Sequence, residues 1–372
     1  MPNNVITRVH TGNKGEWSEI YAFFKLLSDP VLYASDAHLN KIIDKYLDVQ
    51  KIIREEKNRE TNQKEKRIYD LTGGKENITI SDANGVLIKT VNLTELRRGV
   101  QDIFESIKNG KGRSFSVPDA DEFMEIFLCK EIKAASSEKA DIRLIVHDRF
   151  SPGEIEAGFS IKSAFKAPPT LLNASKKNTS FLYKVIGRAD EKSINSVTGS
   201  SAVRDRTNSI YDAGGSLKFL DIESPTFKRN LRRIDSQLPE IIAAMLVQYF
   251  KGVATNVSDI VQSLAENVSL DAFDLNIGDY EYKVKQFLEA VALGMTPGKV
   301  WNGRASAQGG YIIVKEDGEL LCFHLYNREK FLDYLYENTK LESPSTTRHG
   351  YGHAENNGEE NIFRLNLQVR FK

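Results

Sequence analysis

The chain of 372 residues carries 51 lysines and arginines and 51 aspartates and glutamates, so its formal net charge is zero. This balance excludes a uniformly basic protein that coats nucleic acid, and any nucleic-acid surface must be local. The hydrophobic fraction of 40% is that of an ordinary globular protein, and no apolar run approaches the length of a membrane span. Two cysteines, Cys129 and Cys322, exclude a disulfide framework, so we expect reduced, buried thiols in a cytoplasmic protein with no membrane partner.

The N-terminal segment is predicted to be helical over residues 13–70. Apolar residues at helical spacing indicate a first helix over 17–27, ended by Pro30. The apolar positions of residues 34–53 predict a second helix. The charged run at 54–67 is predicted to be a solvated extension of that helix.

A hairpin and two helices are predicted to follow. The Asn84-Gly85 turn separates two β-rich runs and predicts a hairpin over 78–92. Helical spacing of apolar residues predicts a helix over 96–107. An acidic start predicts a further helix over 119–134, just before the stretch on which the functional argument depends.

Residues 141–163 are predicted to form two strands joined by a turn at 151–153. Side chains repeat with period 2 along a strand, so Ser160 and Lys162 share one face of the second strand. Asp141 opens the first strand and can approach that face. A carboxylate that holds a hard cation and a nearby ammonium are the groups that metal-dependent phosphodiester cleavage needs. The alternative is a solvated hairpin that carries an edge aspartate and lysine.

The other predicted elements lie downstream of this hairpin. Strands are predicted at 181–186, 216–222, 309–314, 320–324 and 363–371. Helices are predicted at 168–175, 241–250, 258–268, 280–294 and 329–337. Basic residues outnumber acidic ones between 162 and 192, which predicts a local positive patch.

Three separated sets of motifs resemble the HpaII-type restriction endonucleases. They are GEWSEIYAFFKLL near the start, GFSIKS followed by PTLLNAS in the middle, and RHGYG with LNLQVRF at the end. The resemblance implies a type II restriction endonuclease that cuts double-stranded DNA at a short palindromic, CCGG-like site. Cleavage would be Mg²⁺-dependent hydrolysis that leaves a 5′-phosphate and a 3′-hydroxyl. A palindrome further implies a homodimer, and the family implies a cognate DNA methyltransferase as genetic partner.

The expected fold is α/β, with a central mixed β-sheet flanked by helices. The resemblance implies a core like that of the PD-(D/E)XK restriction endonucleases, with N- and C-terminal elaborations. A single domain is expected over 1–372, with the nuclease core at about 119–190. The N-terminal helical segment of 13–70 would precede this core, and a DNA-recognition region at about 200–372 would follow it.

The resemblance also assigns roles within the hairpin. Asp141 would be the metal-binding carboxylate, and Lys162 would be the catalytic lysine that steadies the attacked phosphate. Ser160 stands at the metal site where the general motif has an acid. Because a hydroxyl is a weak ligand for a hard cation, a second carboxylate should come from elsewhere.

We favour Glu19 of the first helix as that second acid, both as a catalytic group and as a metal ligand. The alternatives that remain open are Glu16, Glu125, Glu154 and Glu156. The helix dipole alone also favours acidic residues at a helix start, and this purely structural effect is the alternative explanation for the presence of Glu16 and Glu19.

The candidate DNA-binding residues are Ser163, Asn173, Ser175, Arg204, Arg206, Arg304, Arg348 and His349. Hydroxyl and amide groups suit phosphate or minor-groove contacts, and arginine pairs bidentately with guanine, as a G·C-rich site requires. Local turn bonding and solvated charges are the structural alternatives.

Two other functions compete with restriction. One is a repair or recombination nuclease that recognises DNA structure, and the other is a catalytically inactive DNA-binding protein, which Ser160 makes conceivable. An HNH-type metal finger is not supported, because Gly350-Tyr351-Gly352 between His349 and His353 argues against a helix that would place both histidines on one face.

Overall fold

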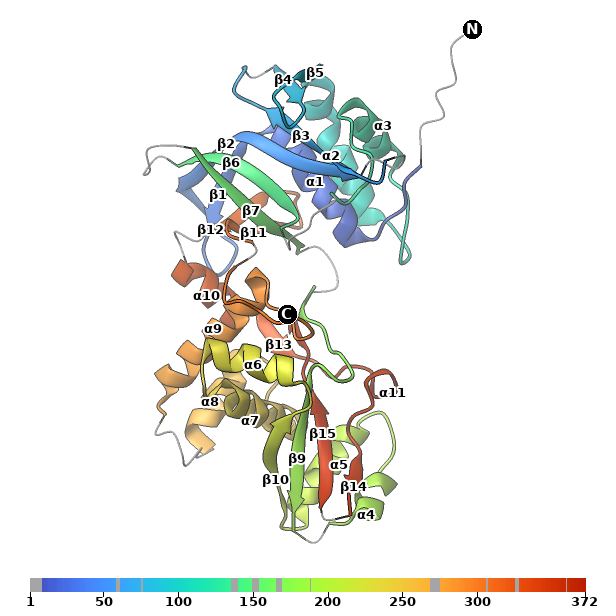
Figure 1. The fold of residues 1–372 in the computed structure, drawn as a ribbon, viewed down its shortest axis with the longest axis vertical. Coiled ribbons are helices and arrows are strands. Elements are labelled where there is room, and N and C mark those ends of the chain that lie inside the picture. The colour runs from blue at the N-terminus through green and yellow to red at the C-terminus, as the bar shows by residue number, and fades with distance from the viewer. Residues whose placement is uncertain are drawn as a thin grey trace. The chain divides into compact units, whose positions relative to one another are not determined.

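The computed structural model describes residues 9–57, 61–74, 76–134, 140–148, 154–164, 169–187, 189–267, 275–305, 307–324, 328–358 and 360–372. The chain divides into two compact units (Figure 1). The first unit consists of Met1–Pro168 with Ser306–Phe331, and the second consists of Pro169–Ala305 with Leu332–Lys372. The helices in the described part of the chain lack the combination of length and apolar composition that a membrane span needs.

The first unit is a mixed sheet with helices beside it, as predicted (Figure 1). Its helices are α1 (Lys14–Ser28), α2 (Thr94–Asn109) and α3 (Pro118–Ile126). Its strands are β1 (Val31–Ser35), β2 (Lys41–Lys57), β3 (Lys64–Asp70), β4 (Asn77–Ser81), β5 (Leu87–Asn92), β6 (Ile142–Asp148), β7 (Glu154–Ser163), β11 (Gly310–Val314) and β12 (Leu320–His324). Helix α10 (Arg328–Glu337) starts in this unit and ends in the second.

The strand order among the described residues is β1-β12-β11-β7-β6-β2-β3-β4-β5, and β1 also pairs with β2. Strands β1, β12, β11, β7, β6 and β2 therefore close into a barrel-like ring, and β3, β4 and β5 extend from it. The length of β2 permits this closure, because its first half pairs with β1 and its second half pairs with β3. The closure is a long-range property that the strand predictions did not include.

Helix α1 packs its apolar side against β7 and α2. The predicted first helix is confirmed, with Trp17, Ile20 and Phe24 fully buried in the core of the unit. A capping box between Asn13 and Glu16 starts the helix. The predicted hairpins β4–β5 and β11–β12 and the predicted helix α2 are confirmed as well.

The predicted second helix is wrong, because residues 41–57 form strand β2. Leu47 and Val49 are buried, and the register then shifts at a bulge between Val49 and Lys51. Beyond the bulge three consecutive residues, 52–54, are buried, so the alternation of the first half is lost. This shift breaks the period-2 pattern that marks a strand and produces a spacing that resembles a helix.

The predicted helix over 119–134 ends early, because α3 stops at Ile126. Leu128 adopts the left-handed conformation, with φ of 61°, which an α-helix cannot accommodate. The hydroxyl of Tyr69 on β3 donates a hydrogen bond of 2.8 Å to the carbonyl of Phe127. Tertiary contacts therefore override local helix propensity after α3.

The charged run is not solvated where β2 carries it: Arg54 is 5% exposed and Glu56 is 1% exposed. The Arg54 guanidinium donates to the Glu56 carboxylate and to the carbonyls of Glu131 and Ile132. The Glu56 carboxylate also accepts the N–H of Lys130 at 3.0 Å. Buried charges persist only when they are paired, so this arrangement is a clamp that fixes the chain after α3 to β2.

We expect Glu56→Gln to lower the free energy of unfolding by about 3–5 kcal/mol, because it leaves the buried Arg54 charge without its counterion. Urea denaturation followed by circular dichroism measures the change. The matched control is Glu55→Gln, whose partly exposed carboxylate pairs with Lys64 and should change stability by less than about 0.5 kcal/mol. Equal stabilities for the two variants would contradict the clamp.

The second unit contains two smaller sheets packed with helices (Figure 1). Its helices are α4 (Glu191–Ser196), α5 (Ala202–Asp212), α6 (Pro225–Ile234), α7 (Leu238–Lys251), α8 (Val257–Asn267), α9 (Ile277–Leu293) and α11 (Thr346–His349). Its strands are β8 (Thr170–Leu172), β9 (Ser180–Ile186), β10 (Ser216–Ile222), β13 (Thr339–Leu341), β14 (Ala354–Asn356), β15 (Asn361–Asn366) and β16 (Val369–Phe371). One sheet has the order β10-β9-β15-β14 and the other β13-β16-β8.

Two predictions for this unit are wrong. Residues 168–175 were expected to be a short helix, but 170–172 form β8, which pairs with β16. A single strand was expected over 363–371, but the chain leaves one sheet after Asn366 and enters the other at Val369. Both errors concern short segments whose conformation is set by pairing with distant strands.

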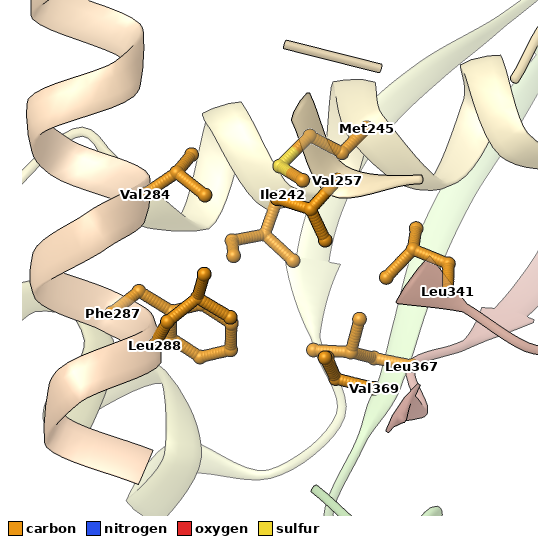
Figure 2. A pocket seen from close by; sticks show the side chains of 9 residues that line it. All are labelled: Ile242, Met245, Val257, Val284, Phe287, Leu288, Leu341, Leu367 and Val369. Carbon is orange, nitrogen blue, oxygen red and sulfur yellow. The ribbon is translucent and has the colours of Figure 1, made fainter. Parts of the chain in front are cut away.

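Helix α7 is the centre of the second unit, and the hydroxyl of Tyr183 on β9 donates a 2.8 Å hydrogen bond to the Ala243 carbonyl of this helix. An apolar cavity of about 10 Å³ remains between α7, α9 and the three-stranded sheet (Figure 2). It is lined by Ile242, Met245, Val257, Val284, Phe287, Leu288, Leu341, Leu367 and Val369. A space of this size without polar groups stays dry, so it is a packing feature of the core.

Candidate active site

Asp141 and Ser160 are joined across strands β6 and β7. Asp141 lies directly before β6, and its N–H donates to the Phe159 carbonyl at 2.8 Å. Its carboxylate oxygen Oδ2 accepts the Ser160 hydroxyl at 2.9 Å and the N–H of Ile161 at 2.8 Å. The antiparallel pairing of the two strands therefore brings the aspartate to the face that carries Ser160, as the alternation in the sequence predicts.

Lys162 lies on that same face of β7. Its Nζ donates to the Ser160 hydroxyl at 3.0 Å and lies 5.5 Å from the centre of the Tyr311 ring on the neighbouring strand β11. Burial lowers the pKa of Lys162, and the nearby carboxylates of Asp141 and Glu19 oppose this shift. Asp141, Ser160 and Lys162 thus form one continuous hydrogen-bonded chain.

Glu19 reaches the same site from helix α1. Its side chain is 11% exposed, and Oε1 accepts the Lys133 ammonium at 3.1 Å. The other oxygen, Oε2, is buried and has no hydrogen-bond partner among the described residues. Burial, reinforced by the charge of Asp141, raises the pKa of Glu19 to about 7, although Lys133 and Lys162 counteract the rise. The effect of the Asp141 charge on Glu19 places the two carboxylates in one electrostatic cluster.

The other candidate acids have different surroundings. The carboxylate of Glu16 accepts the N–H of the residue that caps α1, so it completes the capping box. Glu156 forms an ion pair of 3.4 Å with an arginine of β6, and Glu125 and Glu154 are exposed. Among these candidates, Glu19 is therefore the acid with a buried oxygen that lacks a hydrogen-bond partner in the described residues and whose pKa the charge of Asp141 affects.

The donor set suits a hard cation. Among the described residues, no three histidine, cysteine, aspartate or glutamate side chains gather closely enough to form a closed metal cage. Two carboxylates, Asp141 and Glu19, offer oxygen ligands, and Oε2 of Glu19 accepts no hydrogen bond from the residues that the structure describes, so it is free to act as a ligand. Mg²⁺ is commonly held by one or two carboxylates and completes its shell with water and phosphate oxygens.

Of the predicted DNA-binding residues, Ser163 ends β7 in the first unit, and the others lie in the second unit. Four of those have exposed side chains: Asn173, Arg204, Arg304 and Arg348. His349 follows Arg348 in α11 and is partly buried, and both burial and the arginine charge lower its pKa.

Arg206 is 6% exposed and binds its own chain. It donates to the carbonyls of Val197 at 2.9 Å and Gly352 at 2.7 Å, and it contacts Nδ1 of His353 at 2.8 Å. These contacts hold the segment before α5 against the segment before β14.

Ser175 belongs to a turn held by a buried polar network. Its N–H donates to the Thr179 hydroxyl at 2.8 Å, and its own hydroxyl accepts the Asn178 amide at 3.0 Å. Thr179 in turn donates to the Asn366 side chain at 2.8 Å. The turn is therefore fixed to β15, and it presents the exposed Asn173 near its start.

Lys133 was missed by the sequence analysis. The predicted helix over 119–134 gave it no special position, whereas the structure places its ammonium on Glu19. No local pattern marks this lysine, because its position depends on the clamp formed by Arg54 on a distant strand.

Comparisons with known proteins agree over nearly the whole chain. The sequence profile of the HpaII restriction endonuclease matches residues 13–371. The type II restriction enzyme HpaII from Haemophilus parainfluenzae is 40% identical over 368 residues, which cover 98% of this chain and 100% of that enzyme. No solved structure matches the chain. The chain therefore belongs to the HpaII restriction endonuclease family and is a type II, site-specific DNA-cleaving enzyme.

Proposed function

We propose that the enzyme hydrolyses double-stranded DNA at a short palindromic, CCGG-like site, with a PD-(D/E)XK-like centre formed by Asp141, Glu19 and Lys162. The observation that carries this proposal is the hydrogen-bonded chain from Asp141 through Ser160 to Lys162, with an oxygen of Glu19 in the same cluster that has no hydrogen-bond partner in the described part of the chain. The β6–β7 hairpin, with β11 parallel to β7 and α1 packed on β7, supports this core.

Asp141 and Glu19 would hold a magnesium ion, and Ser160 would act by orienting Asp141. When bound, such an ion offsets charge on the attacked phosphate and activates water for attack. The Ser160 hydroxyl donates to Asp141 Oδ2 and accepts from Lys162, so it fixes both side chains at one distance from each other. A serine can therefore replace the usual acid of the motif as a spacer, while Glu19 supplies the missing carboxylate.

Lys162 would stabilise the charge that develops on the phosphate during in-line attack. Its ammonium is largely buried, between the Ser160 hydroxyl and the Tyr311 ring. An oriented positive group in such an environment acts more strongly than it would in water. Attack by water at phosphorus would expel the 3′-oxygen and leave a 5′-phosphate and a 3′-hydroxyl.

Recognition of the target sequence is proposed for the second unit. The exposed arginines Arg204, Arg304 and Arg348 have the geometry to pair with guanine edges or phosphates, and Ser163, Asn173, Ser175 and His349 suit phosphate or minor-groove contacts. Arg206 would contribute by ordering the surrounding segments. A palindromic target favours a two-fold homodimer, and a cognate methyltransferase would protect the host site in the cytoplasm.

Digestion of DNA of known sequence, with the fragment ends sequenced, tests the proposed function. Discrete fragments with 5′-phosphates at one palindrome, formed only with Mg²⁺, are the expected result. Nicking that requires junctions or mismatches would favour a repair nuclease. Retention of DNA without cleavage would favour an inactive binder.

We expect Lys162→Ala to reduce the single-turnover cleavage rate by about 100- to 1000-fold, because it removes one oriented group that stabilises the transition state. Quenched-flow cleavage of a duplex that contains the target measures the rate. Lys89→Ala, on the exposed strand β5, serves as the control and should cleave at the normal rate. Normal turnover in the Lys162 variant would remove this residue from the mechanism.

A further inference from the structure

We propose that Lys133 competes with the divalent cation for the Glu19 carboxylate. The cation must therefore displace the Lys133 ammonium in order to bind. This inference rests on the proposed function, because it takes Glu19 as a metal ligand. It adds a regulatory element to the site: an internal ammonium that occupies the ligand in the absence of metal.

The geometry of the pair supports displacement. Lys133 Nζ lies 3.1 Å from Glu19 Oε1, and the lysine side chain is 57% exposed whereas that of Glu19 is 11% exposed. The glutamate is thus held in the site, while the lysine approaches it from the solvent side. Because exposed ammonium groups exchange a carboxylate for water at little cost, the lysine is the partner that can leave.

The second lysine of the cluster cannot play this part. Lys162 is largely buried, and its Nζ is held by the Ser160 hydroxyl at 3.0 Å. Both lysines are electrostatically coupled to Glu19 and Asp141. A divalent cation added to this cluster repels both ammonium groups, and Lys133, with a side chain that is 57% exposed, is the one that water can readily solvate in its place.

The backbone that carries Lys133 is fixed, which indicates that its position is specified. Arg54 donates to the carbonyls of Glu131 and Ile132, the two residues that precede this lysine. In addition, the imidazole of His10 contacts the Lys130 carbonyl at 3.1 Å. The buried Arg54–Glu56 ion pair therefore holds the irregular segment after α3 beside the site. This constraint keeps the Lys133 ammonium at a high local concentration near Glu19.

Calcium titration of the full-length protein without DNA, followed by calorimetry, tests the inference independently of cleavage. The titration is run at about pH 9, above the pKa of about 7 of Glu19, so that this carboxylate is ionised. Lys133→Met is expected to bind Ca²⁺ about three- to tenfold more tightly than the unmodified enzyme, because the competing ammonium is gone. Lys133→Arg should restore the weaker binding, since guanidinium also pairs with the carboxylate.

Lys130→Met is the matched control. Lys130 lies in the same fixed segment but pairs with Glu65 at 3.0 Å, so its loss should leave Ca²⁺ affinity unchanged. Equal or weaker Ca²⁺ binding by Lys133→Met would overturn the inference, provided that Glu19→Gln weakens binding. If Glu19→Gln binds Ca²⁺ as tightly as the unmodified enzyme, Glu19 is not a ligand and the proposed metal site itself fails. Thermal melting of each variant confirms that it is folded.

Discussion

Replacement of Asp141 by alanine is expected to slow cleavage by about a thousandfold or more, because the loss of a metal-binding carboxylate removes several kcal/mol of charge stabilisation. DNA binding in Ca²⁺ should persist, since the residues proposed to read the DNA lie mainly in the second unit. Single-turnover cleavage with saturating Mg²⁺ measures the first effect, and fluorescence anisotropy with a labelled duplex in Ca²⁺ measures the second.

The structure provides a way to separate chemistry from folding at this position. The Asp141 carboxylate accepts the Ser160 hydroxyl and the N–H of Ile161, so alanine leaves two donors without their partner. Asparagine keeps an acceptor oxygen for these donors but carries no charge. Asp141→Asn should therefore retain near-normal stability and still lose cleavage, and an asparagine variant that cuts DNA at the normal rate would exclude Asp141 as the metal-binding carboxylate.

Glu19→Gln is expected to change stability and activity in opposite directions. The pKa of the Glu19 carboxyl is raised to about 7 in the folded protein, from an ordinary value of 4.5. The folded state therefore binds more protons than the unfolded state between these values, and stability falls as the pH rises through this window. At about pH 8 in metal-free buffer, Glu19 is ionised in the folded protein and the full cost of burying its charge lowers stability. Replacement by the neutral glutamine should therefore raise the free energy of unfolding by roughly 1–3 kcal/mol.

The same substitution should reduce Mg²⁺-dependent cleavage by about 100-fold or more, because a neutral amide is a poor ligand for a hard cation. Urea denaturation at about pH 4 and about pH 8 should show that the stability gain is nearly absent at the lower value and fully developed at the higher one. Glu16→Gln is the matched control on the same helix: glutamine also completes a capping box, so stability should change by less than about 0.5 kcal/mol and cleavage should persist. A Glu19→Gln protein that is less stable at both values would contradict the buried-charge interpretation.

The central hairpin could be predicted from sequence because its determinants are local. Alternation along β7 places Ser160 and Lys162 on one face, and strands this close in sequence favour antiparallel pairing, so Asp141 must arrive near them. Helix α1 was equally readable, since a capping box and a continuous apolar face define it. The conformation of these elements depends on residues nearby in the chain, so local sequence patterns are sufficient to predict them.

The elements that were predicted wrongly owe their conformation to contacts with residues far away in the sequence. Strand β2 pairs with β1 over its first half and with β3 over its second half, and a bulge against β6 lies between Val49 and Lys51, so the sequence of β2 lacks a regular period. The sequence predicts that Arg54 and Glu56 are solvated, but both are buried because the segment after α3 folds over them. Lys133 reaches Glu19 through that same contact, so a residue beside the site was invisible until the fold was known.

The interior position of β6 and β7 in the nine-stranded sheet has a consequence for how these two strands move. Strands β6 and β7 each have a paired neighbour on both sides, so their amide groups are protected by hydrogen bonds along both edges. Such amides exchange with deuterium only when the whole unit opens, whereas those of the outer strand β5 exchange by local fraying. The scaffold that holds Asp141 and Lys162 should thus be among the slowest-exchanging parts of the enzyme, and substrate adjustment would fall to side chains and loops.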